Sequence, residues 1–153
     1  MKPFVKSLFA VFSFFALTEI AVAAEKGNRE EAVALVKKAA TYLKENGKEK
    51  AFAEFSKPGG SFVDRDLYVF AYTTDGKNLA HGANPALVGK SLIDLRDADG
   101  KPIIKNFIEV GNSKAGNGWV DYKWPNPVTK AVEPKATYIE KVNDILIGSG
   151  VYK

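Results

Sequence analysis

Residues 66–73 read DLYVFAYT, and this stretch decides the fold class. Aromatic and β-branched residues that alternate with a period of two are typical of a strand. One face carries aromatic side chains and the other aliphatic ones: Tyr68, Phe70 and Tyr72 against Leu67, Val69 and Ala71. Because both faces are apolar or aromatic, we expect both to be covered by other parts of the chain.

Four further strands are predicted around this one. Asp75-Gly76 is a hairpin turn signal, and it leads into a second strand over 78–82. The last three strands read as an antiparallel meander, and they are expected over 118–124, 135–142 and 145–152.

A long amphipathic helix is predicted before the sheet. Asn28 can cap its first turn while Glu31 reaches back to the cap, and the stop signal is Asn46-Gly47. A short helix is expected at 51–55, and another begins at Pro102. The buried stripe of this last helix is expected to be Ile103, Ile104, Phe107 and Ile108, with Val110 as a further candidate. The fold class is therefore α+β, with a long N-terminal helix packed on an antiparallel sheet of about five strands.

Composition excludes several classes of site. The chain has 153 residues, a net charge of +4, no Cys and one His. Without Cys there is no thiol nucleophile, zinc–thiolate site or iron–sulfur cluster, and one His excludes a site with two imidazoles. No nucleophile or phosphate-loop motif stands in a recognisable setting, so we expect no enzyme activity and no cofactor. Since the positive charge forms no clustered stripe, no nucleic-acid partner is expected.

One acidic motif has part of the pattern of a metal site. Residues 97–100 read DADG, the beginning of a calcium-loop pattern. The pattern lacks the third oxygen ligand and the closing Glu, so a turn explains it better and no metal is expected.

The first 24 residues have the features of a secretory signal peptide. Lys2 and Lys6 precede an apolar run at 8–17, and small residues stand before Glu25. Glu19 argues against the alternative of an uncleaved membrane anchor, because a carboxylate near the end of a short span is costly in lipid. We therefore expect a signal peptide over 1–24 and one domain over 25–153, periplasmic or secreted after cleavage.

Four stretches together resemble the single Cache domain family of the second type. They are DLYVFAYTTDGKNLAHGANPALVGKSLIDLRDADGKPII at 66–104, GWVDYKWPNP at 118–127, PKATYIEKV at 134–142 and ILIGSGVY at 145–152. The resemblance implies a PAS-like Cache fold in which a long helix packs on the sheet. It also implies an extracytoplasmic sensor that binds small molecules, often carboxylates. Receptors of this family continue into a membrane helix and a signalling module, whereas this sequence ends at Lys153, so we expect a free-standing binder or a subunit that docks on a partner.

The resemblance places a ligand pocket between the sheet and the segment joining the second and third strands. The residues that it implies are Tyr68, Phe70, Tyr72, His81, Leu87, Tyr122, Trp124, Lys135 and Tyr138. Such a pocket needs an apolar wall, fixed donors and one cation, which Tyr rings, Tyr hydroxyls and a lysine supply.

Each of these residues also has a plain structural interpretation. The tyrosines can be ordinary core, and Lys135 can be a solvated lysine at a strand start. Strand alternation puts Lys135 and Tyr138 on opposite faces, so without a bulge one of them lies outside the pocket. His81 can be purely structural; if it faces the pocket, binding is expected to change near pH 6 to 7.

The function expected from the sequence is binding of a short organic acid, with the bound state passed to a membrane receptor, kinase or transporter. The alternative is a ligand-free interaction subunit of a periplasmic receptor, transporter or redox assembly.

Overall fold

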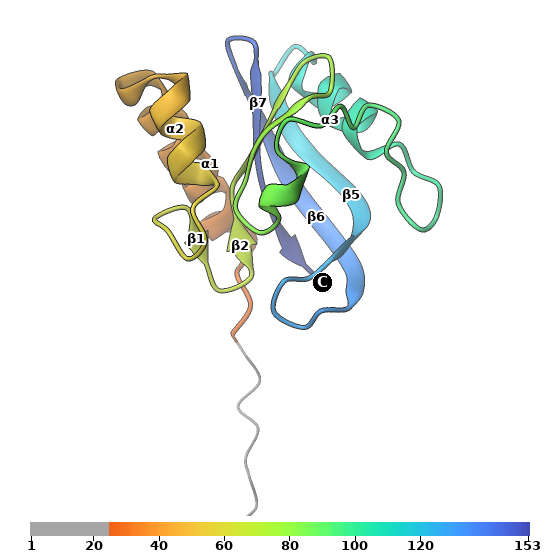
Figure 1. Ribbon diagram of the computed structural model, residues 1–153. Helices are drawn as coiled ribbons and strands as arrows, with labels where there is room; N and C mark the ends of the chain where they lie inside the picture. Colours follow the sequence, from red (N-terminus) through yellow and green to blue (C-terminus); the bar gives the residue numbers. More distant parts are fainter. Residues whose placement is uncertain (1–24) are drawn as a thin grey trace, which may run out of the picture.

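A five-stranded antiparallel sheet forms the centre of the computed structural model, which describes residues 25–153 (Figure 1). The signal peptide predicted over 1–24 lies outside the described residues. The strand order is β4-β3-β7-β6-β5, so the strand from the C-terminal end of the chain lies at the centre. The strands are β3 Phe70–Thr73, β4 Asn78–His81, β5 Asn117–Pro125, β6 Val132–Val142 and β7 Ile145–Tyr152.

The first predicted strand is divided in two. Strand β2 (Leu67–Tyr68) pairs with β1 (Val63–Asp64) in a small hairpin that was not expected from the sequence, and β3 begins after Val69. The turn of this hairpin holds Arg65 at a φ of 57°. The predicted alternation still holds across the break, because the aromatic and the aliphatic side chains pack in different clusters on opposite sides of the sheet.

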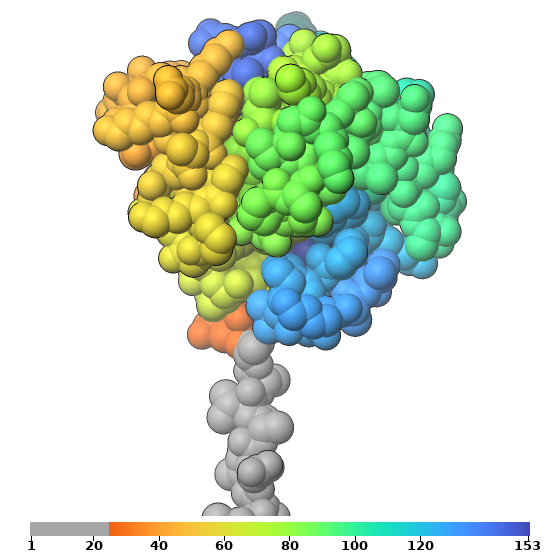
Figure 2. All heavy atoms as spheres, in the orientation of Figure 1, coloured from red at the N-terminus to blue at the C-terminus, as the bar shows by residue number. Residues whose placement is uncertain are grey.

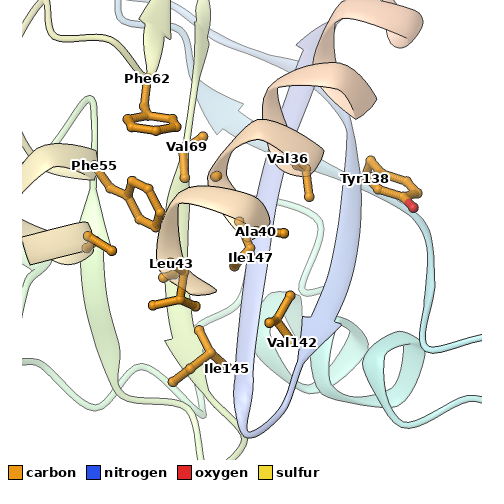
Figure 3. Close-up of a cluster of buried hydrophobic side chains, with 14 residues drawn as sticks. Val36, Ala40, Leu43, Phe55, Phe62, Val69, Tyr138, Val142, Ile145 and Ile147 are labelled. Carbon is orange, nitrogen blue, oxygen red and sulfur yellow. The ribbon is translucent and has the colours of Figure 1, made fainter. Parts of the chain in front are cut away.

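Two helices cover one face of the sheet. Helix α1 (Arg29–Asn46) begins at the predicted capping box, in which Asn28 and Glu31 each accept from the other's backbone N–H. It is followed by α2 (Lys48–Phe55). Figure 3 shows Val36, Ala40 and Leu43 of α1 pointing at the sheet, where they meet side chains such as Ile147. The expected long N-terminal helix on the sheet is confirmed.

The third helix lies on the other face. Helix α3 (Ile103–Gly111) begins one residue later than predicted, with Pro102 as its N-cap. Its buried side chains join the aromatic face of the sheet in a second cluster that includes Ile103, Ile104 and Phe107. The segment from β4 to α3 contains the short 3-10 helix η1 (Pro85–Leu87) and covers the front of the molecule in Figure 2, where it is drawn in green.

Pairing in the sheet aligns residues from distant parts of the sequence. Strand β6 starts at Val132 rather than Lys135, so every residue of β5 has a partner in β6. Lys135 lies directly opposite Tyr122 of β5 on one side and Tyr152 of β7 on the other. Phe70 is likewise opposite His81. Paired residues share a face, so these side chains all project toward α3.

No helix within residues 25–153 combines the length and the apolar character that a membrane crossing requires.

Candidate functional site

A small cavity lies between the aromatic face of the sheet and α3. Its lining comes from β2, β3, β4, β5, α3 and the loop before α3. The lining residues are Tyr68, Phe70, Tyr72, His81, Leu95, Ile103, Ile104, Phe107, Tyr122 and Trp124. Its volume is about 10 Å³, roughly what one water molecule needs.

Aromatic rings form most of the cavity wall. The Phe70 ring stacks on Phe107 with centroids 5.4 Å apart and on His81 at 5.9 Å. Tyr122 meets the same Phe107 ring edge-on at 5.4 Å and lies 6.2 Å from Trp124. These contacts join strands and helix into one apolar wall, so a side chain that moves here displaces its neighbours.

Lys135 supplies the amine of this site. Its side chain is 1% exposed, and Nζ donates to the Tyr68 hydroxyl at 2.8 Å. Nζ also lies 4.0 Å from the centroid of the Tyr68 ring and 4.8 Å from that of Tyr152. Burial lowers the pKa of Lys135 to about 7, against a smaller opposing effect of the Asp66 carboxylate. None of the ion pairs within residues 25–153 includes Lys135.

The Tyr68 hydroxyl belongs to a directional chain of hydrogen bonds. The Tyr152 hydroxyl donates to the Pro125 carbonyl at 2.8 Å, so its single proton is used there. The Tyr68 hydroxyl, 3.2 Å from that of Tyr152, must then be the donor between the two. Lys135 donates to Tyr68, Tyr68 to Tyr152 and Tyr152 to the backbone, which fixes the position of the amine.

His81 is held as a neutral ring with its N–H on one defined nitrogen. Its Nδ1 accepts from the backbone N–H of Ala83 at 3.3 Å and of Asn84 at 2.9 Å, so Nε2 carries the hydrogen. Burial, and secondarily the charge of Lys135, lower the pKa of His81 to about 3. This titration lies well below the pH 6 to 7 range expected from the sequence, because the ring is only 2% exposed.

Six of the nine residues implied by the resemblance line the cavity: Tyr68, Phe70, Tyr72, His81, Tyr122 and Trp124. Lys135 reaches this group through its bond to Tyr68.

Two of the nine lie elsewhere. Leu87 is half-buried in η1, outside the cavity lining. Tyr138 projects to the α1 face, where it packs with Trp119, because β6 alternates without a bulge.

The contribution of α3 and its preceding loop was missing from the predicted set. The sequence predicts Ile103, Ile104 and Phe107 as a buried stripe, but their contact with the aromatic face depends on tertiary packing. Tyr152 was also missed, although its alternation with Val151 places it on the cavity face.

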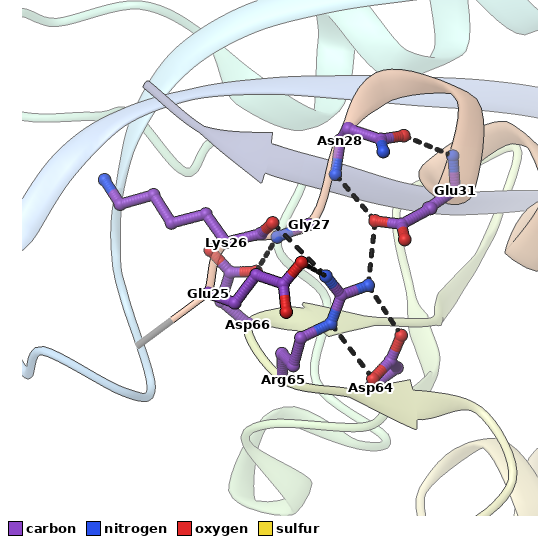
Figure 4. A network of polar contacts seen from close by, with 8 residues as sticks. All are labelled: Glu25, Lys26, Gly27, Asn28, Glu31, Asp64, Arg65 and Asp66. Carbon is purple, nitrogen blue, oxygen red and sulfur yellow. Dashed lines mark hydrogen bonds and ion pairs between the residues drawn. The ribbon is translucent and has the colours of Figure 1, made fainter. Parts of the chain in front are cut away.

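Next to the site, a polar network attaches the β1–β2 hairpin to the start of α1 (Figure 4). Asp66 is 2% exposed and accepts from the Gly27 N–H at 2.7 Å through Oδ1, whereas its Oδ2 has no partner. Arg65 bonds the Lys26 carbonyl and forms an ion pair with Glu31. The buried carboxylate of Asp66 is thus held two residues before Tyr68.

Comparison with known proteins assigns a family to this architecture. The family model described as single Cache domain 2 matches residues 7–153. The chain is 33% identical over 90 residues to the sensor histidine kinase MctS of Rhizobium johnstonii. This aligned region covers 58% of this chain and 19% of that protein. It is 32% identical over 109 residues to the methyl-accepting chemotaxis protein CtpM of Pseudomonas aeruginosa, covering 69% and 18%. The chain therefore spans less than a fifth of the length of these curated relatives.

Solved structures share the fold. A methyl-accepting chemotaxis protein from Vibrio parahaemolyticus matches with a TM-score of 0.70 and 28% identity, over 80% of this chain and 86% of that one. A structure described as the basis for carboxylic acid recognition by a Cache chemosensory domain matches with a TM-score of 0.68 and 24% identity, over 80% and 91%.

Proposed function

Because the chain belongs to the single Cache domain 2 family, we propose that it is an exported binding domain for a short organic acid whose bound state is read by a membrane partner. The observation that carries this proposal is Lys135, a buried amine with a fixed position and no carboxylate paired with it. Burying a cation without an anion is costly, and a ligand carboxylate would supply the missing charge.

The hydrogen-bonding groups around the cavity favour an anion over a cation. Lys135 has N–H groups beyond the one bonded to Tyr68, and His81 presents Nε2–H. Trp124 lines the same cavity with an indole whose only polar group is a donor. No carboxylate is among the lining residues of the described chain, so an ammonium group would find no counter-charge there.

The cavity size supports a short ligand. A space of about 10 Å³ holds a single water molecule, so even a two-carbon acid requires the wall to move. Leu95 lies half-buried in the loop before α3 and belongs to the part of the cavity wall that the sheet does not form. We propose that this loop shifts to admit the ligand and closes over the ligand's apolar end.

The family and the predicted leader support export and a membrane partner. Cache domains are extracytoplasmic sensor domains; they bind ligands and are not enzymes. The two relatives named above are a sensor histidine kinase and a methyl-accepting chemotaxis protein. We propose that residues 1–24 are removed on export and that the folded domain over 25–153 acts in the periplasm.

A second candidate is a ligand-free interaction subunit in a periplasmic assembly. The water-sized cavity favours it, because a domain that only provides a docking surface needs no ligand space. The two candidates differ in whether any small molecule stabilises the fold.

The test is a thermal-shift titration of the full chain, expressed with its own leader and purified from the periplasmic fraction. At a carboxylate concentration one hundred times its dissociation constant, binding adds about 2.7 kcal/mol to the stability of the folded state. We expect a saturable rise in Tm with at least one short carboxylate, lost in Lys135→Met and retained in Lys114→Met, where an exposed lysine is changed. No shift across the panel at millimolar concentrations would favour the interaction subunit.

A further inference from the structure

The surroundings of Lys135 determine how its amine responds to a bound anion. Titratable groups face it from every neighbouring element: Tyr68 of β2, Asp66 before β2, His81 of β4, Tyr152 of β7 and Tyr122 of β5. The cleft on the outer side of Lys135 adds Asp97, Asp99, Lys101, Asp121, Lys123 and Lys153.

The acidic groups of that outer cleft already have partners. Asp99 pairs with Lys123 at 3.0 Å, and Asp121 pairs with Lys153 at 2.8 Å. Asp97 accepts from the backbone N–H groups of 99, 101 and 123. Asp66 is the remaining carboxylate near Lys135, and it bonds Gly27 rather than the amine.

The empty site therefore holds an enclosed amine between two phenol rings, without a paired anion. In such surroundings the neutral amine is favoured, since desolvation penalises the charged form. A carboxylate bound beside Nζ reverses this preference, because the attraction between opposite charges is strong where water is excluded.

The neighbouring groups cannot take the proton in place of Lys135. Protonation of His81 at Nδ1 would remove the acceptor used by Ala83 and Asn84, and it would place a second cation near Lys135. Burial raises the pKa of Tyr68 and Tyr122, so their hydroxyls stay protonated.

We propose that in neutral to alkaline solution this site takes up one proton from solvent with each carboxylate it binds, the neutral amine of Lys135 becoming the ammonium that pairs with the ligand. The step rests on the proposed function. In this step the neutral amine, one proton and the carboxylate combine into an ammonium–carboxylate pair. The lone pair of Nζ forms the new N–H bond, and no bond of the ligand is broken. The domain then reports the acid and the acidity of its compartment together.

The coupling predicts a specific pH dependence. Below pH 7 Lys135 is already protonated in most of the empty molecules, so the affinity changes little with pH. Above pH 7 each further pH unit weakens binding up to tenfold, because the proton must be supplied from a more dilute pool.

The first experiment needs no ligand. The Cε signal of Lys135 is followed by NMR from pH 5 to 11 in protein labelled at lysine, and the signal is assigned by its loss in Lys135→Met. A midpoint near pH 7 supports the proposal. A midpoint above pH 9 overturns it, whatever the ligand.

The second experiment measures proton uptake by calorimetry with acetate, propionate and succinate, at pH 8 in two buffers of different ionisation enthalpy. We expect close to one proton taken up per carboxylate bound, and about tenfold weaker binding at pH 9 than at pH 8. Lys135→Arg keeps a permanent charge, so a folded arginine variant should bind without uptake.

The outcomes separate the two proposals. Binding without proton uptake refutes the coupling alone. No binding of any of the three acids at pH 6 refutes the proposed function and the coupling with it. Uptake that is lost in His81→Gln while binding persists would assign the proton to the histidine and refute the role of Lys135.

Discussion

Replacing Lys135 with methionine should stabilise the empty domain, and the gain should depend on pH. The fall of its pKa from 10.5 to about 7 means that the fold disfavours the ammonium by roughly 4 to 5 kcal/mol, at 1.36 kcal/mol per pH unit. This penalty is fully present below pH 7, where the amine is charged in both states. Between pH 7 and 10.5 only the unfolded chain holds the proton, so stability rises with pH and the penalty fades.

The difference between the two proteins can be worked out from these values. Methionine fills nearly the same volume without charge, at the cost of one hydrogen bond to Tyr68, about 1 kcal/mol. The variant is therefore expected to be more stable than the parent by roughly 3 to 4 kcal/mol at pH 6. This advantage should shrink by roughly 2 to 3 kcal/mol on going to pH 9.

The assay is urea unfolding at pH 6, 7, 8 and 9, with the exposed Lys114→Met as the control. The control should differ from the parent by less than about 0.5 kcal/mol at each pH. A Lys135→Met difference that stays constant from pH 6 to 9 would refute the reasoning, because it would mean that Lys135 keeps an ordinary pKa in the folded state.

Three further changes test other parts of the site. Between pH 6.5 and 4 the His81→Gln variant should lose about 3 kcal/mol less stability than the parent, as measured by unfolding curves at the two pH values. The reason is that a histidine with a folded pKa of about 3 stays neutral in the fold while the unfolded chain takes up a proton. Gly148→Ala places a Cβ against the Phe70 ring and should cost 1 to 3 kcal/mol and abolish ligand-induced thermal shifts, whereas an unchanged Tm would contradict the packing. Tyr68→Phe should weaken carboxylate binding in calorimetry, while Tyr138→Phe, on the other face, should leave it unchanged.

Local regularity explains what the sequence predicted well. A strand residue points opposite to its neighbour whatever the tertiary context, so the alternation in DLYVFAYT separated the cavity face from the helix face. The capping box at Asn28 was predictable for the same reason, since its atoms lie within one helical turn. The same rule puts Lys135 and Tyr138 on opposite faces, and the regular ladder of β6 places Lys135 on the cavity face and Tyr138 on the α1 face.

What depended on long-range packing was not predictable. Nothing within residues 103–107 shows which face of the sheet α3 covers, so three wall residues were missed. Leu87 was placed in the pocket from the family pattern alone, but η1 leaves it outside the lining. The burial of Lys135 also required the structure, because a lysine after a proline at a strand start is most often solvated.

The stability of the empty domain and its affinity for an anion depend on the same charge. A buried ammonium without a paired carboxylate lowers the free energy of unfolding, and a methionine in its place would remove that penalty. The hydrogen bonds through Tyr68 and Tyr152 hold the amine at one position, so a ligand that reaches it meets a preorganised donor. Any carboxylate that pairs with Lys135 cancels a cost already present in the fold, and the penalty in the empty state therefore becomes part of the binding free energy. For this reason the domain should bind best under the acidic conditions in which its empty form is least stable.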